Sequence, residues 1–134
     1  MKRLLIALLV LTVAVTGLAF VAHSAEQAKS KIIIIGSAGG ISPRTLTVSK
    51  GTTVVWLNNA NDNATIYFSK GKEVEAVCAA PSRFALDSEG KYNSGPLPQG
   101  ATASVCFIEA GKYQYEVVGQ KLGGLKGSGT IIVK

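Results

Sequence analysis

Short runs of β-branched residues, separated by turn residues, occupy most of the chain after residue 26. Apolar runs of about four to eight residues, bounded by Gly, Asn or Pro, are typical of β-strands. The runs that fit this description lie at 31–35, 44–48, 52–57, 65–68, 101–107, 112–118 and 130–133. Four consecutive isoleucines in the first run predict a strand that is buried on both faces.

The segments between these runs predict turns and one irregular stretch. Residues 58–63 are rich in Asn and Asp, which favour turns because their side chains bond to the nearby backbone. Residues 72–98 follow no clear period, and a short helical or irregular segment is expected around 73–80. About seven to eight short strands punctuated by Gly and Asn predict an all-β fold, a Greek-key antiparallel β-sandwich.

The N-terminus has the pattern of a secretory signal peptide. Lys2 and Arg3 precede an apolar run at 4–22, and small residues follow it up to Ala25. We therefore expect residues 1–25 to be removed. The alternative is an uncleaved membrane anchor, because the apolar run is almost long enough to span a bilayer. Both interpretations export the domain, to the periplasm or to the exterior.

The length of 134 residues is that of a single domain. We expect residues 26–40 to form a lead-in and the first strand, and residues 41–134 to form the rest of that domain. Without residues 1–25 the chain holds 12 basic and 8 acidic side chains, a net charge of +4. The basic residues are mostly scattered lysines, and no Arg-rich or aromatic-interleaved patch indicates a nucleic-acid partner.

Candidate catalytic chemistry is limited by the residue types that the domain lacks. The only histidine is His23 and the only methionine is Met1, and both fall in the predicted signal peptide. Hydrolysis by a Ser-His-Asp or Cys-His arrangement is therefore excluded in the exported domain. No Gly-rich phosphate loop is present either, so we expect a protein that is not an enzyme.

Three longer motifs follow one another along the domain. The first is Thr-Val-Ser-Lys-Gly-Thr-Thr-Val-Val-Trp-Leu-Asn-Asn at 47–59. The second is Ser-Gly-Pro-Leu-Pro-Gln-Gly at 94–100, followed by Ser-Val-Cys-Phe at 104–107. The third is Gly-Lys-Tyr-Gln-Tyr at 111–115, which leads through Gly-Leu-Lys-Gly at 124–127 to the last strand. In this order they resemble the cupredoxins, the small blue-copper electron carriers such as plastocyanin and azurin. The resemblance implies a cupredoxin-like sandwich.

The resemblance also implies where a copper site would lie. A blue-copper centre takes two imidazoles, one thiolate and a weak thioether from the protein. Transferred by spacing, these four positions fall on Ala64, Val117, Gln120 and Leu125. Shifting the alignment by one or two residues brings in no imidazole or thiolate. We expect a degenerate site that is closed by apolar side chains, with no metal and no other cofactor.

Cys78 and Cys106 are the only cysteines. A pair of cysteines in an exported protein predicts a structural disulfide, which would tie the irregular segment to the strand that ends at Phe107. The alternative is a thiol-disulfide redox protein that uses the same two residues. Such proteins commonly have a closely spaced Cys-x-x-Cys motif, whereas these cysteines lie 28 positions apart.

Our leading functional hypothesis is an exported cupredoxin-like domain without type-1 copper, acting as a binding, accessory or structural module. Its partner would be an unidentified periplasmic protein, and it would contact a membrane only through an uncleaved N-terminal segment. The alternative hypothesis is a periplasmic copper-binding electron-transfer protein of the plastocyanin type, which would need a metal site made of other ligands or completed by a partner chain.

Partners of cupredoxins dock at the apolar end of the sandwich, so the resemblance implies a contact surface on the loop at 118–127. Its candidate contact residues are Gln120, Lys121, Leu122 and Lys126. A small apolar patch with a polar rim is suited to protein contact. We expect Leu125 to point inward, whereas the pattern leaves the orientation of Leu122 open.

Overall fold

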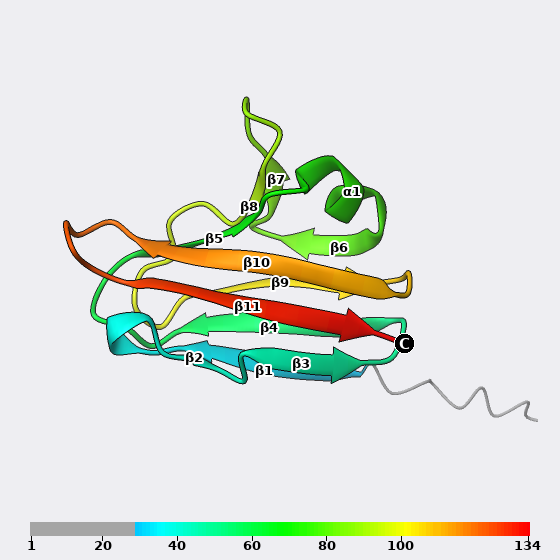
Figure 1. The fold of residues 1–134 in the computed structure, drawn as a ribbon, viewed down its shortest axis with the longest axis horizontal. Coiled ribbons are helices and arrows are strands. Elements are labelled where there is room, and N and C mark those ends of the chain that lie inside the picture. The colour runs from blue at the N-terminus through cyan, green and yellow to red at the C-terminus, as the bar shows by residue number, and fades with distance from the viewer. Residues whose placement is uncertain (1–28) are drawn as a thin grey trace, which may run out of the picture.

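Two β-sheets face each other in the computed structural model, which describes residues 29–134 (Figure 1). The predicted signal peptide lies outside the described residues. The first sheet, sheet A, has the strand order β2-β1-β4-β9-β6. Its strands are β1 (Ser30–Ile35), β2 (Ile41–Ser42), β4 (Thr52–Asn58), β6 (Cys78–Ser82) and β9 (Thr102–Phe107).

The second sheet, sheet B, has the strand order β3-β11-β10-β5-β8-β7. Its strands are β3 (Thr45–Val48), β5 (Ala64–Phe68), β7 (Ala85–Leu86), β8 (Tyr92–Asn93), β10 (Gly111–Gly119) and β11 (Lys126–Val133). A 3-10 turn η1 (Ser37–Gly39) and a short helix α1 (Gly71–Ala76) complete the elements. Within residues 29–134, no helix has the length and apolarity needed to span a bilayer.

The predicted β-sandwich is confirmed, and each of the seven predicted strands is present. Three of the eleven strands have only two residues, which leaves eight longer ones. Most neighbouring strands are antiparallel, but β1 runs parallel to β4 and β3 runs parallel to β11, so both sheets are mixed. The segment at 72–98, expected to be irregular, contains most of α1 together with β6, β7 and β8.

Strand β1 is buried on one face only, so the prediction of burial on both faces was wrong. Ile33 and Ile35 are fully buried, whereas Ile32 is 58% exposed and Ile34 is 43% exposed. Successive side chains of a strand point to opposite faces, and no other layer formed by residues 29–134 covers the outer face of sheet A. The outward isoleucines therefore contact solvent.

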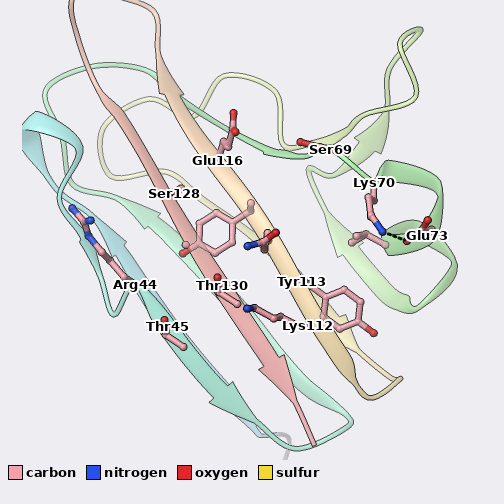
Figure 2. Close-up of a pocket in the computed structure, with 14 residues that line it drawn as sticks. Arg44, Thr45, Ser69, Lys70, Glu73, Lys112, Tyr113, Glu116, Ser128 and Thr130 are labelled. Carbon is pink, nitrogen blue, oxygen red and sulfur yellow. Dashed lines mark ion pairs between the residues drawn. The ribbon is translucent and has the colours of Figure 1, made fainter.

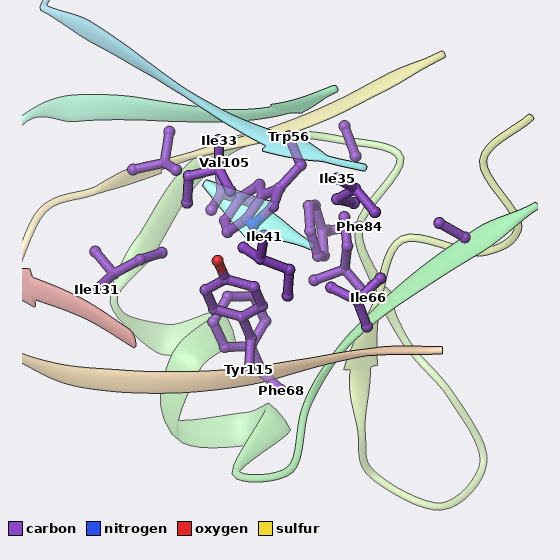
Figure 3. Packing of buried hydrophobic residues seen from close by; sticks show 14 of the residues in the cluster. Ile33, Ile35, Ile41, Trp56, Ile66, Phe68, Phe84, Val105, Tyr115 and Ile131 are labelled. Atoms are coloured by element: carbon purple, nitrogen blue, oxygen red, sulfur yellow. The ribbon is translucent and has the colours of Figure 1, made fainter. Parts of the chain in front are cut away.

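Aromatic side chains from both sheets meet in the centre of the sandwich (Figure 3). Trp56 of β4 is fully buried, and its ring lies 5.4 Å from that of Tyr115 in β10 at an interplanar angle of 82°. Phe68 and Phe84 lie 5.9 and 5.4 Å from the same Trp56 ring. Edge-to-face contacts of this kind add to the stabilisation from buried area.

One glycine makes room for this cluster. Gly129 of β11 lies opposite Tyr115 of β10 on the core face, and a Cβ atom at Gly129 would overlap the tyrosine hydroxyl. A second glycine, Gly51, has a φ of +77° and forms the turn between β3 and β4, a conformation that other residues rarely adopt. Glycine is therefore required at these two positions for different reasons, close packing at one and backbone conformation at the other.

Candidate functional site

The loops at one end of the sandwich contain two of the four positions that the resemblance assigns to copper ligands, Gln120 and Leu125, and the other two, Ala64 and Val117, lie on strands next to these loops. We call this end the loop end and define it by residues 59–63, 94–101 and 119–125, at the left of Figure 1. Ala64 pairs with Gly119 across β5 and β10, and the Gly119 N–H donates a 2.6 Å hydrogen bond to the Leu125 carbonyl. The structure therefore brings these segments together as expected.

Three of the four positions belong to the core. Ala64 and Val117 are fully buried, and Leu125 is 4% exposed, which confirms the expected inward orientation of Leu125. Gln120 lies at the surface, where its Oε1 accepts a 2.9 Å hydrogen bond from Nδ2 of Asn63. The aliphatic side chains have no lone pairs to offer a metal, so this set of residues does not fit a type-1 copper ion.

A buried amide organises the loop end, and the sequence analysis did not identify it. Asn58, the last residue of β4, is fully buried. Its Nδ2 donates to the carbonyl oxygens of Asp62 and Leu97, at 2.7 Å each, and its Oδ1 accepts from the N–H of Ala60 at 3.0 Å. The Asn-Asn pair at the end of a strong strand was the available signal, because such residues often bond to the backbone two positions on.

The loop between β10 and β11 is fastened to the loop between β4 and β5. The Asp62 carboxylate is buried, and its Oδ2 accepts a 3.3 Å hydrogen bond from the N–H of Lys121. The side chain of Lys121 also takes part, since its Nζ donates a 2.6 Å hydrogen bond to the carbonyl of Asn61. Gly119 and Gly124 pass so close to Asp62 that a Cβ atom at either position would collide with its carboxylate. The base of the β10–β11 loop is thus held by side-chain as well as main-chain bonds.

Leu122 is fully exposed at the tip of this loop. The other predicted contact residues are also on the surface, namely Gln120, Lys121 and Lys126. Two glycines follow Leu122, and a hollow of about 230 Å³ lies beside them, bounded in part by Ala38 and Asp62. Leu122 is therefore an apolar side chain presented to solvent on a loop whose base is fixed.

The expected disulfide is not formed, and both cysteines are free thiols. In the antiparallel register of β6 and β9, Cys78 lies opposite Phe107 and Ala79 lies opposite Cys106. Since side chains alternate along a strand, Cys78 packs toward the core while Cys106 points to the outer face of sheet A. Two Cβ atoms that point apart cannot be bridged without moving the backbone.

The Cys78 thiol is difficult to ionise in this position. Burial raises the pKa of Cys78 to about 12, with a further contribution from the neighbouring Cys106. A thiol must be deprotonated to act as a nucleophile or a metal ligand. Within residues 29–134, no group of three or more His, Cys, Asp or Glu side chains is arranged to hold a metal ion.

A broad hollow of about 700 Å³ lies away from the loop end, over the outer face of sheet B beside α1 (Figure 2). Its charged groups have both signs and include Arg44, Lys112 and Glu116, together with the Lys70–Glu73 ion pair at 3.4 Å. No cysteine or histidine lines it. This hollow has no nucleophile and general base in contact, so it does not have the composition of a catalytic site.

Solved structures of amicyanin variants have a similar fold. A methionine-to-alanine variant of amicyanin in its Cu(I) form matches with a TM-score of 0.54 and 18% identity, covering 78% of this chain and 82% of that chain. The oxidised state of a proline-to-alanine variant of amicyanin matches with the same TM-score of 0.54, identity of 18% and coverages. No protein-family model and no curated protein matches this chain. At this level of identity, the likeness shows the fold alone.

The two leucines of the β10–β11 loop should respond oppositely to the same substitution. Leu125→Ser removes a buried side chain and places a hydroxyl in the core, so we expect a loss of about 2–5 kcal/mol in the free energy of unfolding. Leu122→Ser alters a fully exposed side chain and should change that free energy by less than about 0.5 kcal/mol. Urea unfolding of both variants measures the difference. Equal destabilisation would show that Leu122 is also packed.

The Cys78 thiol should react slowly with alkylating reagents at neutral pH. With a pKa of about 12, roughly one molecule in ten thousand carries the thiolate at pH 8. In a Cys106→Ser variant, where Cys78 is the sole thiol, the rate of iodoacetamide labelling should rise tenfold per pH unit between about pH 7 and 10. The same variant unfolded in guanidinium provides the control, because its rate should level off near the ordinary pKa of about 8.5. If the labelling rate of the folded protein also levelled off below about pH 10, the raised pKa of Cys78 would be contradicted.

Proposed function

We propose that this chain, which has a cupredoxin-like fold, is an exported domain that works without type-1 copper as a binding or accessory module. Its contact surface is the loop between β10 and β11. The observation that supports this proposal is the opposite placement of two leucines in that loop, since Leu125 fills the interior while Leu122 is fully exposed.

The residues at the loop end support a role that does not depend on copper. Ala64, Val117 and Leu125 fill the interior with aliphatic atoms, and Gln120 is engaged with Asn63. Redox cycling of copper in this fold depends on thiolate and imidazole ligands. An electron-transfer function of the plastocyanin type would need such ligands from elsewhere.

The loop has the features of a contact site. A single apolar side chain, Leu122, stands among polar neighbours that include Lys121 and Lys126, an arrangement of apolar centre and polar rim. Lys121 donates hydrogen bonds to Asp62 and Asn61, and these bonds hold the base of the loop in place without a partner. Binding through a loop that is already ordered avoids part of the entropy cost of association.

The thiol-disulfide alternative has no comparable support. Cys78 and Cys106 lie on neighbouring strands but point to opposite faces of sheet A. The raised pKa of Cys78 also disfavours the thiolate that would start an exchange reaction.

Site-specific crosslinking in permeabilised cells tests the contact surface. A photoreactive amino acid in place of Leu122 should yield one discrete adduct, and excess purified wild-type protein should suppress that adduct more strongly than the Leu122→Ser variant does. The same amino acid in place of Ser88, an exposed residue between β7 and β8, serves as the control and should give no such adduct. Equal adducts from both positions, or none from position 122, would overturn the proposed surface.

Purified protein should bind no type-1 copper. After Cu²⁺ is added and the protein is desalted, we expect substoichiometric copper and no intense visible absorption from copper–thiolate charge transfer. A variant that combines Ala64→His, Val117→Cys, Gln120→His and Leu125→Met restores the expected donor set and provides the positive control. A stoichiometric, intensely coloured species in the wild-type protein would contradict the proposal.

A further inference from the structure

The end of the sandwich opposite the loop end is basic. We call it the basic pole and define it by the turns and strand ends at 29–31, 49–52, 108–112 and 133–134. The described chain begins at this end, beside its C-terminus (Figure 1). The main chain joins these segments, because the Thr53 N–H donates to the carbonyl of Lys29 at 2.8 Å and the Lys50 N–H donates to that of Lys134 at 3.2 Å.

Positive charge exceeds negative charge on these segments. Lys29, Lys31, Lys50 and Lys112 are all exposed. Lys134 lies there as well and is also exposed. Glu109 is the single acidic residue of the four segments, and it lies 3.7 Å from Nζ of Lys50 with both side chains more than half exposed. The acidic residues of α1, which lies to one side, are accompanied by Lys70 and Lys72.

An apolar side chain is exposed among these charges. The hairpin turn between β9 and β10 carries Ile108, which is 43% exposed, and Ala110, which is also exposed. The ring of Tyr113 covers Phe107 beside this turn, with ring centroids 5.0 Å apart, and its hydroxyl donates to the Glu109 carbonyl at 3.0 Å. The turn is therefore held in place while Ile108 projects into solvent.

The position of the N-terminal apolar run indicates what covers this pole. The run ends at Ala22, seven residues before Lys29, and seven extended residues span at most about 25 Å. When that run occupies a bilayer, the basic pole cannot lie farther than this from the membrane surface. Lysines close to an anionic bilayer each improve association roughly fivefold, and an apolar side chain at the same level enters the interface.

We propose that, in a chain that keeps residues 1–25 as a membrane anchor, the basic pole is the membrane-facing end of the domain, where its lysines bind anionic lipid head groups and Ile108 enters the interface. The loop end then faces away from the bilayer. This proposal uses the opposite end of the molecule from the β10–β11 loop, so it does not rest on the proposed function. Because the attraction is electrostatic between exposed groups, it weakens as salt is added.

Tryptophan placed at either end of the domain tests this orientation. The full chain is reconstituted from detergent into phosphatidylcholine vesicles that contain acyl-brominated lipid, with and without phosphatidylglycerol. The native Trp56 is fully buried and provides a constant background. Fluorescence of the Ile108→Trp variant should be quenched at least twofold more with phosphatidylglycerol than without it, and the Leu122→Trp variant should show no such quenching.

Charge reversal distinguishes the contribution of the lysines to membrane association from that of Ile108. Adding Lys50→Glu and Lys112→Glu to Ile108→Trp should abolish the dependence of quenching on phosphatidylglycerol, whereas adding Lys126→Glu, a charge reversal beside the loop end, should leave that dependence intact. Unfolding midpoints of all variants verify that they fold. Equal quenching at positions 108 and 122, or none at 108, would overturn the proposal. Binding to heparin without quenching by lipid would also overturn it and identify a polyanion site instead.

Discussion

The buried side-chain amide of Asn58 determines the shape of the loop end. Its side chain makes three hydrogen bonds, and its main chain makes two more, to the Ala101 carbonyl at 3.0 Å and from the Gly100 N–H at 2.7 Å. A buried polar group without a partner costs about 1–3 kcal/mol, so these bonds allow one arrangement of the two loops and disfavour others. The bridge between Ala64 and Leu97 then forms beside them.

Packing and side-chain bonds of the protein contribute to the order of the loop end. Leu125 and Val117 supply apolar packing, and the Asp62 carboxylate bonds to the main chain of Lys121. The solved amicyanin structures share the fold, and in this chain aliphatic and amide groups occupy the positions to which the resemblance in sequence assigns copper ligands. A shared sandwich thus accommodates different chemistry at its loops, as is usual for widely used folds.

Much of the architecture could be predicted because β-branched runs and turn residues act locally. The same reasoning fails where burial or strand pairing depends on segments that are distant in the sequence. Four isoleucines hide the period of two that distinguishes a half-exposed strand, so β1 was assigned two buried faces. The two-residue strands β7 and β8 exist through their pairing with each other and with β5.

The candidate site was predictable to a similar extent. The spacing of the three motifs predicted correctly that Leu125 is buried. Motifs that follow in the same order and at the same spacing as in a known family indicate which positions correspond. The cysteine pair was misjudged because spacing does not determine register. A slip of one residue moves a side chain to the other face of a sheet, and Cys78 and Cys106 differ by one such step. The role of Asn58 depends on carbonyl groups up to 39 positions away, which no local pattern reveals.

The parallel pairing of β3 with β11 has a consequence for the time at which the domain can form. Thr45 lies beside Thr130 and Val48 lies beside Val133, although about 85 positions separate them along the chain. Until the residues of β11 have been synthesised, β3 has no partner and sheet B lacks its final strands. Contacts between distant segments also slow folding, because the entropy of closing a long loop must be lost first. Sheet B is therefore completed only after β11 is available, so the domain forms late and not segment by segment along the chain.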